Sequence, residues 1–329
     1  MPWHLWQTQS WVRTAAECIL WGALGILLGA CTPATIAPSA PVTIRIAGST
    51  AATPALRDLT DAYSRHHPNV AFDLRGGGST LGEEWIAAGE YDMVVSTLFA
   101  ENSNSNPATE AQPPIALDGE AENAAMPLGT NITPSATLSP QRPPQISLIR
   151  SLIALDGLAI VVHPANKVES LTPLQLRDLY SGHLLNWREV GGRDEDVLLV
   201  SREDGSGARA LFEARVMGGE SVSLTAVVMP THADVVQYVA AHPQAVGYVS
   251  RGYVSNILTG ADDDPSVHIL AVDGVYPMIE NLRDQSYAFV YPLHLIIRRE
   301  SSPQVRRFLE FVLSPPGQEI ISRYYAPIR

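Results

Sequence analysis

Three loops of the chain combine glycine with hydroxyl side chains where a strand should end and a helix should begin. They are Gly48-Ser49-Thr50, Gly78-Ser79-Thr80 and Gly205-Ser206-Gly207. A helix N-terminus offers unpaired N–H groups and a partial positive charge, hydroxyls add further donors, and glycine lets the backbone approach a ligand closely. Each loop alone would also suit an ordinary helix cap. The three together favour a cradle for an oxyanion.

Arg202 strengthens this interpretation, because it lies just before the third loop. A guanidinium group can clamp an oxyanion with two parallel, charge-assisted hydrogen bonds. Burying a multiply charged anion costs much hydration energy, and hydrogen bonds to a charged group contribute about 1.5–3 kcal/mol each. Several converging donors are therefore expected around one point.

Two enzyme classes fit the same residues poorly. A serine hydrolase of the G-x-S-x-G type needs a spacing that Asp204-Gly205-Ser206-Gly207 lacks. The dinucleotide fingerprint also fails, because its third glycine position holds Ala210. We therefore expect a binding protein without catalysis and without a cofactor.

The elements that must position these loops form repeated strand–loop–helix units. The first series predicts strands at 42–47, 70–74 and 91–95, with helices at 53–67 and 80–88. Further strands are expected at 158–162, 197–200, 245–249, 267–272 and 289–297, and further helices at 173–181, 208–216, 233–241, 303–313 and 316–324. Alternating strands and helices predict mainly parallel sheets flanked by helices. Ligands of such sheets bind beyond the carboxyl ends of the strands, where the three loops lie.

Composition limits the class of partner. The chain has 329 residues, which suits two domains, and its net charge is −12. This balance argues against a nucleic acid, whose phosphates need clustered lysine and arginine, but leaves a buried small anion possible. The cysteines are Cys18 and Cys31, so no zinc-binding spacing exists and no metal site is expected.

The N-terminus predicts an exported lipoprotein. A short apolar run at 19–30 follows Arg13 and is too short to span a bilayer, but it suits the core of a signal peptide. The run ends in Leu28-Gly29-Ala30-Cys31, which resembles a bacterial lipobox with Cys31 as the lipidated residue. A plain secretory peptide and an uncleaved anchor are the alternatives. Residues 1–31 are therefore the predicted signal peptide, and 32–41 form a Pro- and Ala-rich tether.

A second low-complexity segment interrupts the pattern at 100–149. Most of it is rich in Ala, Pro, Asn, Ser and Thr, and no Lys or Arg occurs from Gly76 to Gln141. Its low apolar content predicts a largely disordered insertion; a functional lid is the alternative.

The loops and their surroundings resemble the phosphate-binding proteins of phosphate ABC importers, which have the type II periplasmic-binding-protein fold. The resemblance covers most of 42–329 apart from the insertion. Its most specific part is the run Ser201–Arg209 (SREDGSGAR). It also includes Ala47–Thr50 with Pro54, Gly77–Ser79, Asp92 with Ser96-Thr97, Asp156–Val162 with Pro164-Ala165-Asn166, Leu171–Gly182, Asn186-Trp187, Val190–Gly192 and Ala245–Tyr248.

This resemblance implies which residues contact the anion. They would be Ser49, Thr50, Gly78, Ser79, Ser96, Thr97, Arg202, Ser206, Gly207 and Ala208. Two positions depart from the family pattern. Ala208 stands where the family often has Thr, and Thr97 stands where some members have an Asp that accepts a proton from phosphate. Asp204 or Glu203 could replace that acceptor, although both also suit the cap of the following helix.

The resemblance also implies the architecture and the biological role. It implies an α/β fold of two lobes with the ligand in the cleft, at 42–99 plus 251–329 and at 150–250. The protein would be an extracytoplasmic monomer, anchored to the membrane through Cys31, that captures inorganic phosphate for an ABC permease. Binding of sulfate or molybdate, and a role as an anion sensor, remain alternatives.

Overall fold

The computed structural model describes residues 40–98, 147–263 and 265–328. The predicted signal peptide with Cys31, and most of the tether and of the predicted insertion, lie outside the described residues. The last residues of that insertion are described, and Leu148 and Ile149 already belong to a strand.

The first strands follow the predicted β–α–β–α–β order. Strands β1 (Val42–Gly48), β2 (Val70–Gly77) and β3 (Met93–Ser96) form a parallel sheet in the order β2-β1-β3. Between them lie a 3-10 turn, η1 (Thr50–Ala52), and the helices α2 (Thr53–His66) and α3 (Gly78–Ala88). The prediction ended β2 at Leu74, which was wrong: the glycines that suggested a turn still pair with β1, after a register shift that matches Gly48 with Gly77.

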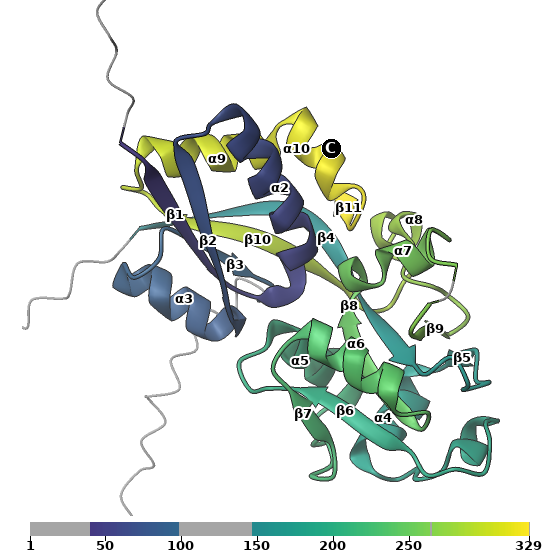
Figure 1. Ribbon diagram of the computed structural model, residues 1–329. Coiled ribbons are helices and arrows are strands. Elements are labelled where there is room, and N and C mark those ends of the chain that lie inside the picture. The colour runs from purple at the N-terminus through teal and green to yellow at the C-terminus, as the bar shows by residue number, and fades with distance from the viewer. Residues whose placement is uncertain (1–39, 99–146, 264, 329) are drawn as a thin grey trace, which may run out of the picture. The chain divides into compact units, whose positions relative to one another are not determined.

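The long strand β4 (Leu148–Val162) connects two groups of strands. Its first ten residues pair antiparallel with β10 (Val290–Arg298), and its last five pair antiparallel with β8 (Ala245–Ser250). The change of partner falls between Gly157 and Leu158, and Figure 1 shows β4 running from one group into the other. The prediction began this strand at Leu158, because Arg150, Ser151 and Asp156 break the apolar pattern; those polar residues belong to the strand.

We call the two groups the first and the second lobe. The first lobe contains β1, β2, β3, β10, the first ten residues of β4, and the C-terminal elements α9 (Pro303–Leu313), α10 (Pro315–Ile321) and β11 (Ala326–Pro327). The second contains the end of β4 with β5 (Ser170–Leu171), β6 (Leu198–Arg202), β7 (Val227–Met229), β8 and β9 (His268–Val272). Its helical segments are α4 (Pro173–Ser181), η3 (Trp187–Val190), α5 (Gly207–Phe212), the π-helix η4 (Glu213–Met217), α6 (His232–Ala241), η5 (Arg251–Tyr253), α7 (Ser255–Leu258) and α8 (Ile279–Arg283).

The strand pairing bears on where the chain returns to the first lobe. Strand β9 pairs with Ile160–Val162 of β4, whereas β10 pairs with β3 and with the first part of β4. The predicted boundary at residues 250 and 251 stays a prediction, and we propose that the return lies between β9 and β10.

Local sequence explains the sharpest element boundaries. Helix α4 begins after Thr172, whose hydroxyl accepts the N–H of Gln175 while the Gln175 side chain accepts the N–H of Thr172. Pro173 suits the first helical position, and Gly182 ends the helix in the left-handed conformation (φ 83°). These signals lie within eleven residues, which is why the predicted range 173–181 is confirmed.

Buried strands lie at the centre of this α/β fold, where its two lobes join. All six residues of β8 are buried, as expected for a strand covered on both faces. A large apolar core includes Leu158 and Tyr248 of the second lobe and Ile46, Leu295 and Phe308 of the first. This arrangement positions the ends of β1, β3 and β6, which carry the predicted anion loops.

Candidate functional site

The first loop presents one satisfied hydroxyl and one unsatisfied hydroxyl. Ser49 donates its N–H to the carbonyl of Val95 (2.9 Å), and its Oγ accepts the N–H of Ala51 (3.3 Å). The Oγ1 of Thr50 is buried and has no hydrogen-bond partner among the residues that the structure describes. Because a buried hydroxyl is normally paired, Thr50 offers a donor to a ligand.

The Gly78-Ser79-Thr80 loop and the end of β3 meet at a pair of buried hydroxyls. Ser79 Oγ lies 3.0 Å from Thr97 Oγ1, and it accepts the N–H of Thr97 (3.1 Å). Gly77 and Gly78 precede the serine with φ angles of 132° and 79°, which glycine adopts without strain. The two segments thus bring their hydroxyls to one point from β2 and β3.

Arg202, at the end of β6, is the largest polar side chain of the site and is 2% exposed. Its Nε donates to the carbonyl of Met229 (3.1 Å), and its Nη2 donates to the carbonyl of Pro230 (3.0 Å) and to Glu203 Oε1 (2.9 Å). Its Nη1 is buried and has no partner in the described part of the chain. The guanidinium is therefore fixed along one edge and keeps a free NH₂ group.

The Gly205-Ser206-Gly207 loop lies close to the Gly78-Ser79-Thr80 loop and to the end of β3. The N–H of Thr80 donates to the carbonyl of Gly205 (3.4 Å), which joins the two lobes directly. A Cβ atom built on Gly207 would lie 1.7 Å from Thr97 Oγ1 and 2.7 Å from Ser79 Oγ. Only glycine allows this contact, so the backbone of Gly207 stands directly against the paired hydroxyls.

The remaining predicted residues of the cradle differ in how they are placed. Ser206 and Ala208 are buried beside Gly207, and Ser206 Oγ makes no capping bond to α5. Ser96 Oγ instead donates to Glu83 and accepts the N–H of Leu98 (3.2 Å). Glu83 is also paired with Arg150 (2.7 Å). A contact between Ser96 and an anion stays a prediction. The Ser96 hydroxyl already has two hydrogen-bond partners, Glu83 and the N–H of Leu98.

The two acidic residues just before Gly205, Glu203 and Asp204, both form salt bridges. Glu203 is paired with Arg202, and Asp204 pairs with Arg209 (2.8 Å), which also pairs with Glu213 (2.8 Å). Arg209 thus lies on its helix in two salt bridges.

The sequence argument missed three aromatic residues that support the loops. Tyr248 OH lies 2.8 Å from Ser201 Oγ and accepts the N–H of Arg202 (3.2 Å). Tyr253 OH donates to the carbonyl of Thr50 (2.9 Å). Tyr248 was noted only as part of the Ala245–Tyr248 run, and no local pattern marks Tyr253.

His232, the third of these residues, is buried at the start of α6. Its Nδ1 accepts the N–H of Ser250 (3.2 Å). Burial, and to a lesser extent the nearby charge of Arg202, hold the pKa of His232 well below its usual value. The ring is therefore neutral at pH 7, with its proton on Nε2.

Within the described ranges, no group of three His, Cys, Asp or Glu side chains is arranged to hold a metal ion. No helix among those residues is long and apolar enough to cross a membrane.

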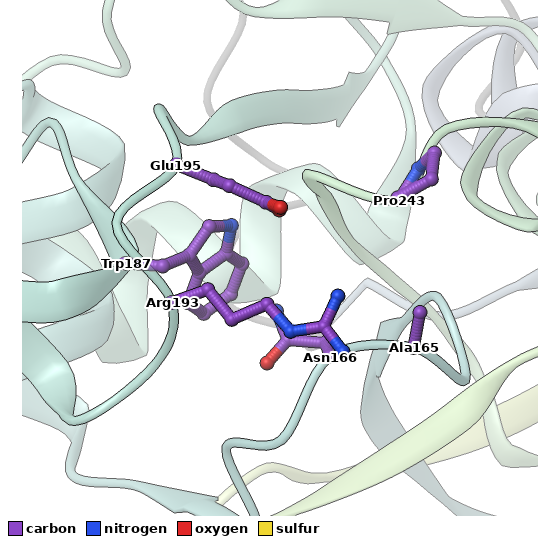
Figure 2. Close-up of a pocket in the computed structure, with 6 residues that line it drawn as sticks. All are labelled: Ala165, Asn166, Trp187, Arg193, Glu195 and Pro243. Carbon is purple, nitrogen blue, oxygen red and sulfur yellow. The ribbon is translucent and has the colours of Figure 1, made fainter.

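A small pocket of the second lobe is too narrow to compete with the loops as a ligand site. It lies between Trp187, Arg193, Glu195 and Pro243, as Figure 2 shows. Its volume is about 10 Å³, which is room for about one water molecule. Trp187 fixes one wall by donating Nε1–H to the carbonyl of Gln244 (2.9 Å).

The fold and the loops define a class: a two-lobed α/β binding protein whose strand-end loops converge from both lobes. Comparison with known proteins agrees, because the PBP superfamily domain matches residues 35–119 and 133–316. The chain belongs to the PBP superfamily.

Individual relatives show which members of the superfamily the chain is similar to. The chain is 23% identical over 287 residues to the phosphate-binding protein PstS of Bacillus subtilis, covering 87% of this chain and 80% of PstS. A structure of a phosphate ABC transporter substrate-binding protein from Clostridium perfringens, with bound phosphate, aligns with a TM-score of 0.68 at 25% identity. It covers 87% of this chain and 100% of that protein. An ABC-type phosphate transport receptor from Vibrio cholerae aligns with a TM-score of 0.58 at 26% identity, covering 85% and 98%.

Proposed function

We propose that this protein is an extracytoplasmic substrate-binding protein that captures inorganic phosphate and delivers it to an ABC permease. The observation that carries the proposal is a pair of buried donors without partners, Arg202 Nη1 and Thr50 Oγ1, in loops of opposite lobes. Ser79, Thr97 and Gly207 lie together between the same lobes. The phosphate-binding relatives support the choice of ligand.

The proposed contacts come from the three anion loops, from Arg202 and from the end of β3. We propose as phosphate ligands the residues Ser49, Thr50, Gly78, Ser79, Thr97, Arg202, Ser206, Gly207 and Ala208. Ser96 belongs to the set predicted from the sequence, but its hydroxyl already donates to Glu83. Hydroxyl and N–H donors at fixed positions replace the water that the anion loses, and each bond to the charged anion contributes about 1.5–3 kcal/mol. Because the donors belong to both lobes, binding should favour the closed arrangement.

The proposed role includes an anchor and excludes turnover. Lipidation at Cys31 would hold a monomer at the membrane beside its permease, and the protein would release phosphate chemically unchanged. Replacing Cys31 by Ser should release the protein from the membrane fraction; continued labelling by radioactive palmitate would contradict the anchor.

A second candidate keeps the site and changes the anion. Phosphate carries a proton at neutral pH whereas sulfate does not, and a carboxylate acceptor is one basis for preferring phosphate. Thr97 and Ala208 replace residues that the resembling family often uses, and Glu203 and Asp204 are engaged in salt bridges. These observations favour a site that also accepts sulfate.

Calorimetric titration of the purified protein with phosphate, sulfate and molybdate tests both candidates. The proposal predicts one phosphate site and a rise in melting temperature with phosphate concentration. Heat from sulfate or molybdate with none from phosphate would replace the proposed ligand. No heat and no thermal shift with any of the three anions would contradict the binding function.

A further inference from the structure

A cavity of about 250 Å³ lies beside the first loop, between the two lobes. Its walls include Ser49 and Thr50 of that loop, Arg57 of α2, Arg75 of β2, and Thr231 and Tyr253 of the second lobe. An apolar cavity of about 150 Å³ holds a benzene molecule, so this one has room for more than a single oxyanion.

The charge of the cavity has one sign. Among the described residues, the charged side chains that line it are Arg57 and Arg75, although the whole chain has a net charge of −12. Arg57 makes no ion pair with any residue in the described ranges. Arg75 pairs with Asp73 (3.3 Å), but both side chains are exposed, and such pairs contribute about 0–1 kcal/mol. Both guanidinium groups are therefore available to an anion.

Other residues that line the cavity add hydrogen-bond donors. Thr50 Oγ1 is buried and without a partner. Helix α6, with ten residues, begins at the cavity wall, where Thr231 uses its hydroxyl to accept the N–H of Asp234 (3.1 Å). The first N–H groups of a helix have no partners within the helix, and its N-terminus attracts negative charge.

The cavity adjoins the proposed phosphate site. The two share Ser49 and Thr50. On the other side, Arg202 binds the carbonyl of Pro230, and the next residue, Thr231, lines the cavity. A ligand whose phosphoryl group lies against Thr50 and Arg202 would thus extend toward Arg57 and Arg75.

We propose that this cavity is a second anion subsite, which accepts phosphate compounds carrying a second anionic group a few bonds away, such as a diphosphate or a phosphorylated carboxylic acid. The proposal rests on the proposed function, because the first phosphoryl group occupies the phosphate site. The second group pairs with Arg57 and Arg75, while the apolar side chains of Leu56 and Leu74 contact the connecting atoms.

Calorimetry with four ligands at one salt concentration tests the subsite. The ligands are phosphate, inorganic diphosphate, 3-phosphoglycerate and glycerol 3-phosphate, whose tail is neutral. We expect diphosphate or 3-phosphoglycerate to bind about tenfold more tightly than glycerol 3-phosphate, and whichever does so identifies the source of the second anionic group. In the double variant Arg57→Gln, Arg75→Gln this difference should vanish, while the Kd for phosphate stays within about twofold.

Arg65→Gln provides the matched control, because Arg65 is exposed on the same helix and does not line the cavity. Equal affinities for charged and neutral tails in the wild type, or a difference that survives the double variant, would overturn the subsite while leaving the phosphate site intact. If the wild type binds no phosphate at all, the proposed function itself fails, and the subsite fails with it.

Discussion

Two regions of this protein bury polar groups but satisfy them differently. One is the crossing where β4 changes partner between Gly157 and Leu158, which we call the hinge, and the other is the cleft at the anion loops. At the hinge, Asp156 is fully buried, and its Oδ2 accepts hydrogen bonds from Ser250 Oγ (2.5 Å) and Tyr291 OH (2.6 Å). Its Oδ1 accepts the N–H of Gly157 (2.7 Å). In the cleft, Thr50 Oγ1 and Arg202 Nη1 are buried without partners.

The difference separates groups that serve the fold from groups that serve a ligand. A buried polar atom without a partner costs about 1–3 kcal/mol, and this cost is recovered only when a partner arrives. The Asp156 network joins β4, β8 and β10 where β4 changes partner, so it fixes the crossing between the lobes. It also reaches the cleft, because Ser250 Oγ and Tyr325 OH both donate to the carbonyl of Ala51 (3.2 and 2.6 Å), next to Thr50.

Removing the positive charge of Arg202 should have the largest effect on phosphate binding. Arg202→Gln removes two expected charge-assisted hydrogen bonds, so phosphate should bind about 150-fold more weakly, a loss of about 3 kcal/mol. Isothermal titration calorimetry measures the change. Arg215→Gln is the control, because Arg215 is an exposed arginine of η4, in the same lobe as Arg202. Equal phosphate affinity of Arg202→Gln and wild type would remove Arg202 from the site.

The hinge should instead respond to pH. Burial raises the pKa of Asp156 to about 6, although hydrogen bonds from Ser250 and Tyr291 and the charge of Arg251 act against this rise. A raised folded-state pKa means that the protonated form stabilises the fold. This stabilisation is fully present below pH 3.8, the unfolded-state pKa, and is lost as pH rises through about 6.

Asp156→Asn measures this effect, because asparagine does not ionise. From pH 4 to pH 7, the free energy of unfolding of the wild type should fall relative to the variant by about 2 kcal/mol. Urea unfolding at four pH values gives the difference, in which the other titrating groups cancel. Parallel curves for the two proteins would show that the Asp156 carboxyl has no raised pKa.

Thr50→Val separates the two kinds of buried polar group most cleanly. Replacing the unpaired hydroxyl by a methyl group of similar shape should weaken phosphate binding about tenfold, through the loss of one hydrogen bond. The unliganded protein should keep its stability or gain about 1 kcal/mol. Thr43→Val, at an exposed position of β1, controls for the change of residue type. A marked loss of unliganded stability in Thr50→Val would mean that the hydroxyl has a partner in the fold.

Ser96→Ala should have the smallest effect on binding. Because its hydroxyl already donates to Glu83, phosphate affinity should change less than about threefold. Unfolding should become easier by about 1–2 kcal/mol, since Glu83 loses a donor. The same calorimetric and urea measurements apply. A large loss of affinity at unchanged stability would assign Ser96 to the phosphate site after all.

Local signals in the sequence predicted the loops but not how each hydroxyl is used. The glycines, the hydroxyl residues and Arg202 lie in short runs, so the strand–loop–helix order and the convergence of the loops could be inferred. Ser49 and Thr50 are adjacent and chemically alike, yet only the fold decides that Ser49 caps η1 while Thr50 stays unpaired. Local pattern also placed the start of β4 ten residues too late, because its pairing with β10 is non-local.

The hinge was beyond sequence reasoning for the same reason. The partners of Asp156 are 94 and 135 residues away in the chain, and both come from strands that pair with β4. No spacing rule connects residues at such distances. From the sequence, Asp156 was named only as the first residue of the run Asp156–Val162, whereas it is the centre of the hinge network.

A crystal structure of the protein with phosphate tests the central claim most directly. The account predicts one phosphate between the lobes, with oxygen atoms about 2.7–3.2 Å from Arg202 Nη1 and Thr50 Oγ1, so that both lose their unpaired state. An ordered phosphate elsewhere, with these two atoms still unpartnered, would contradict it.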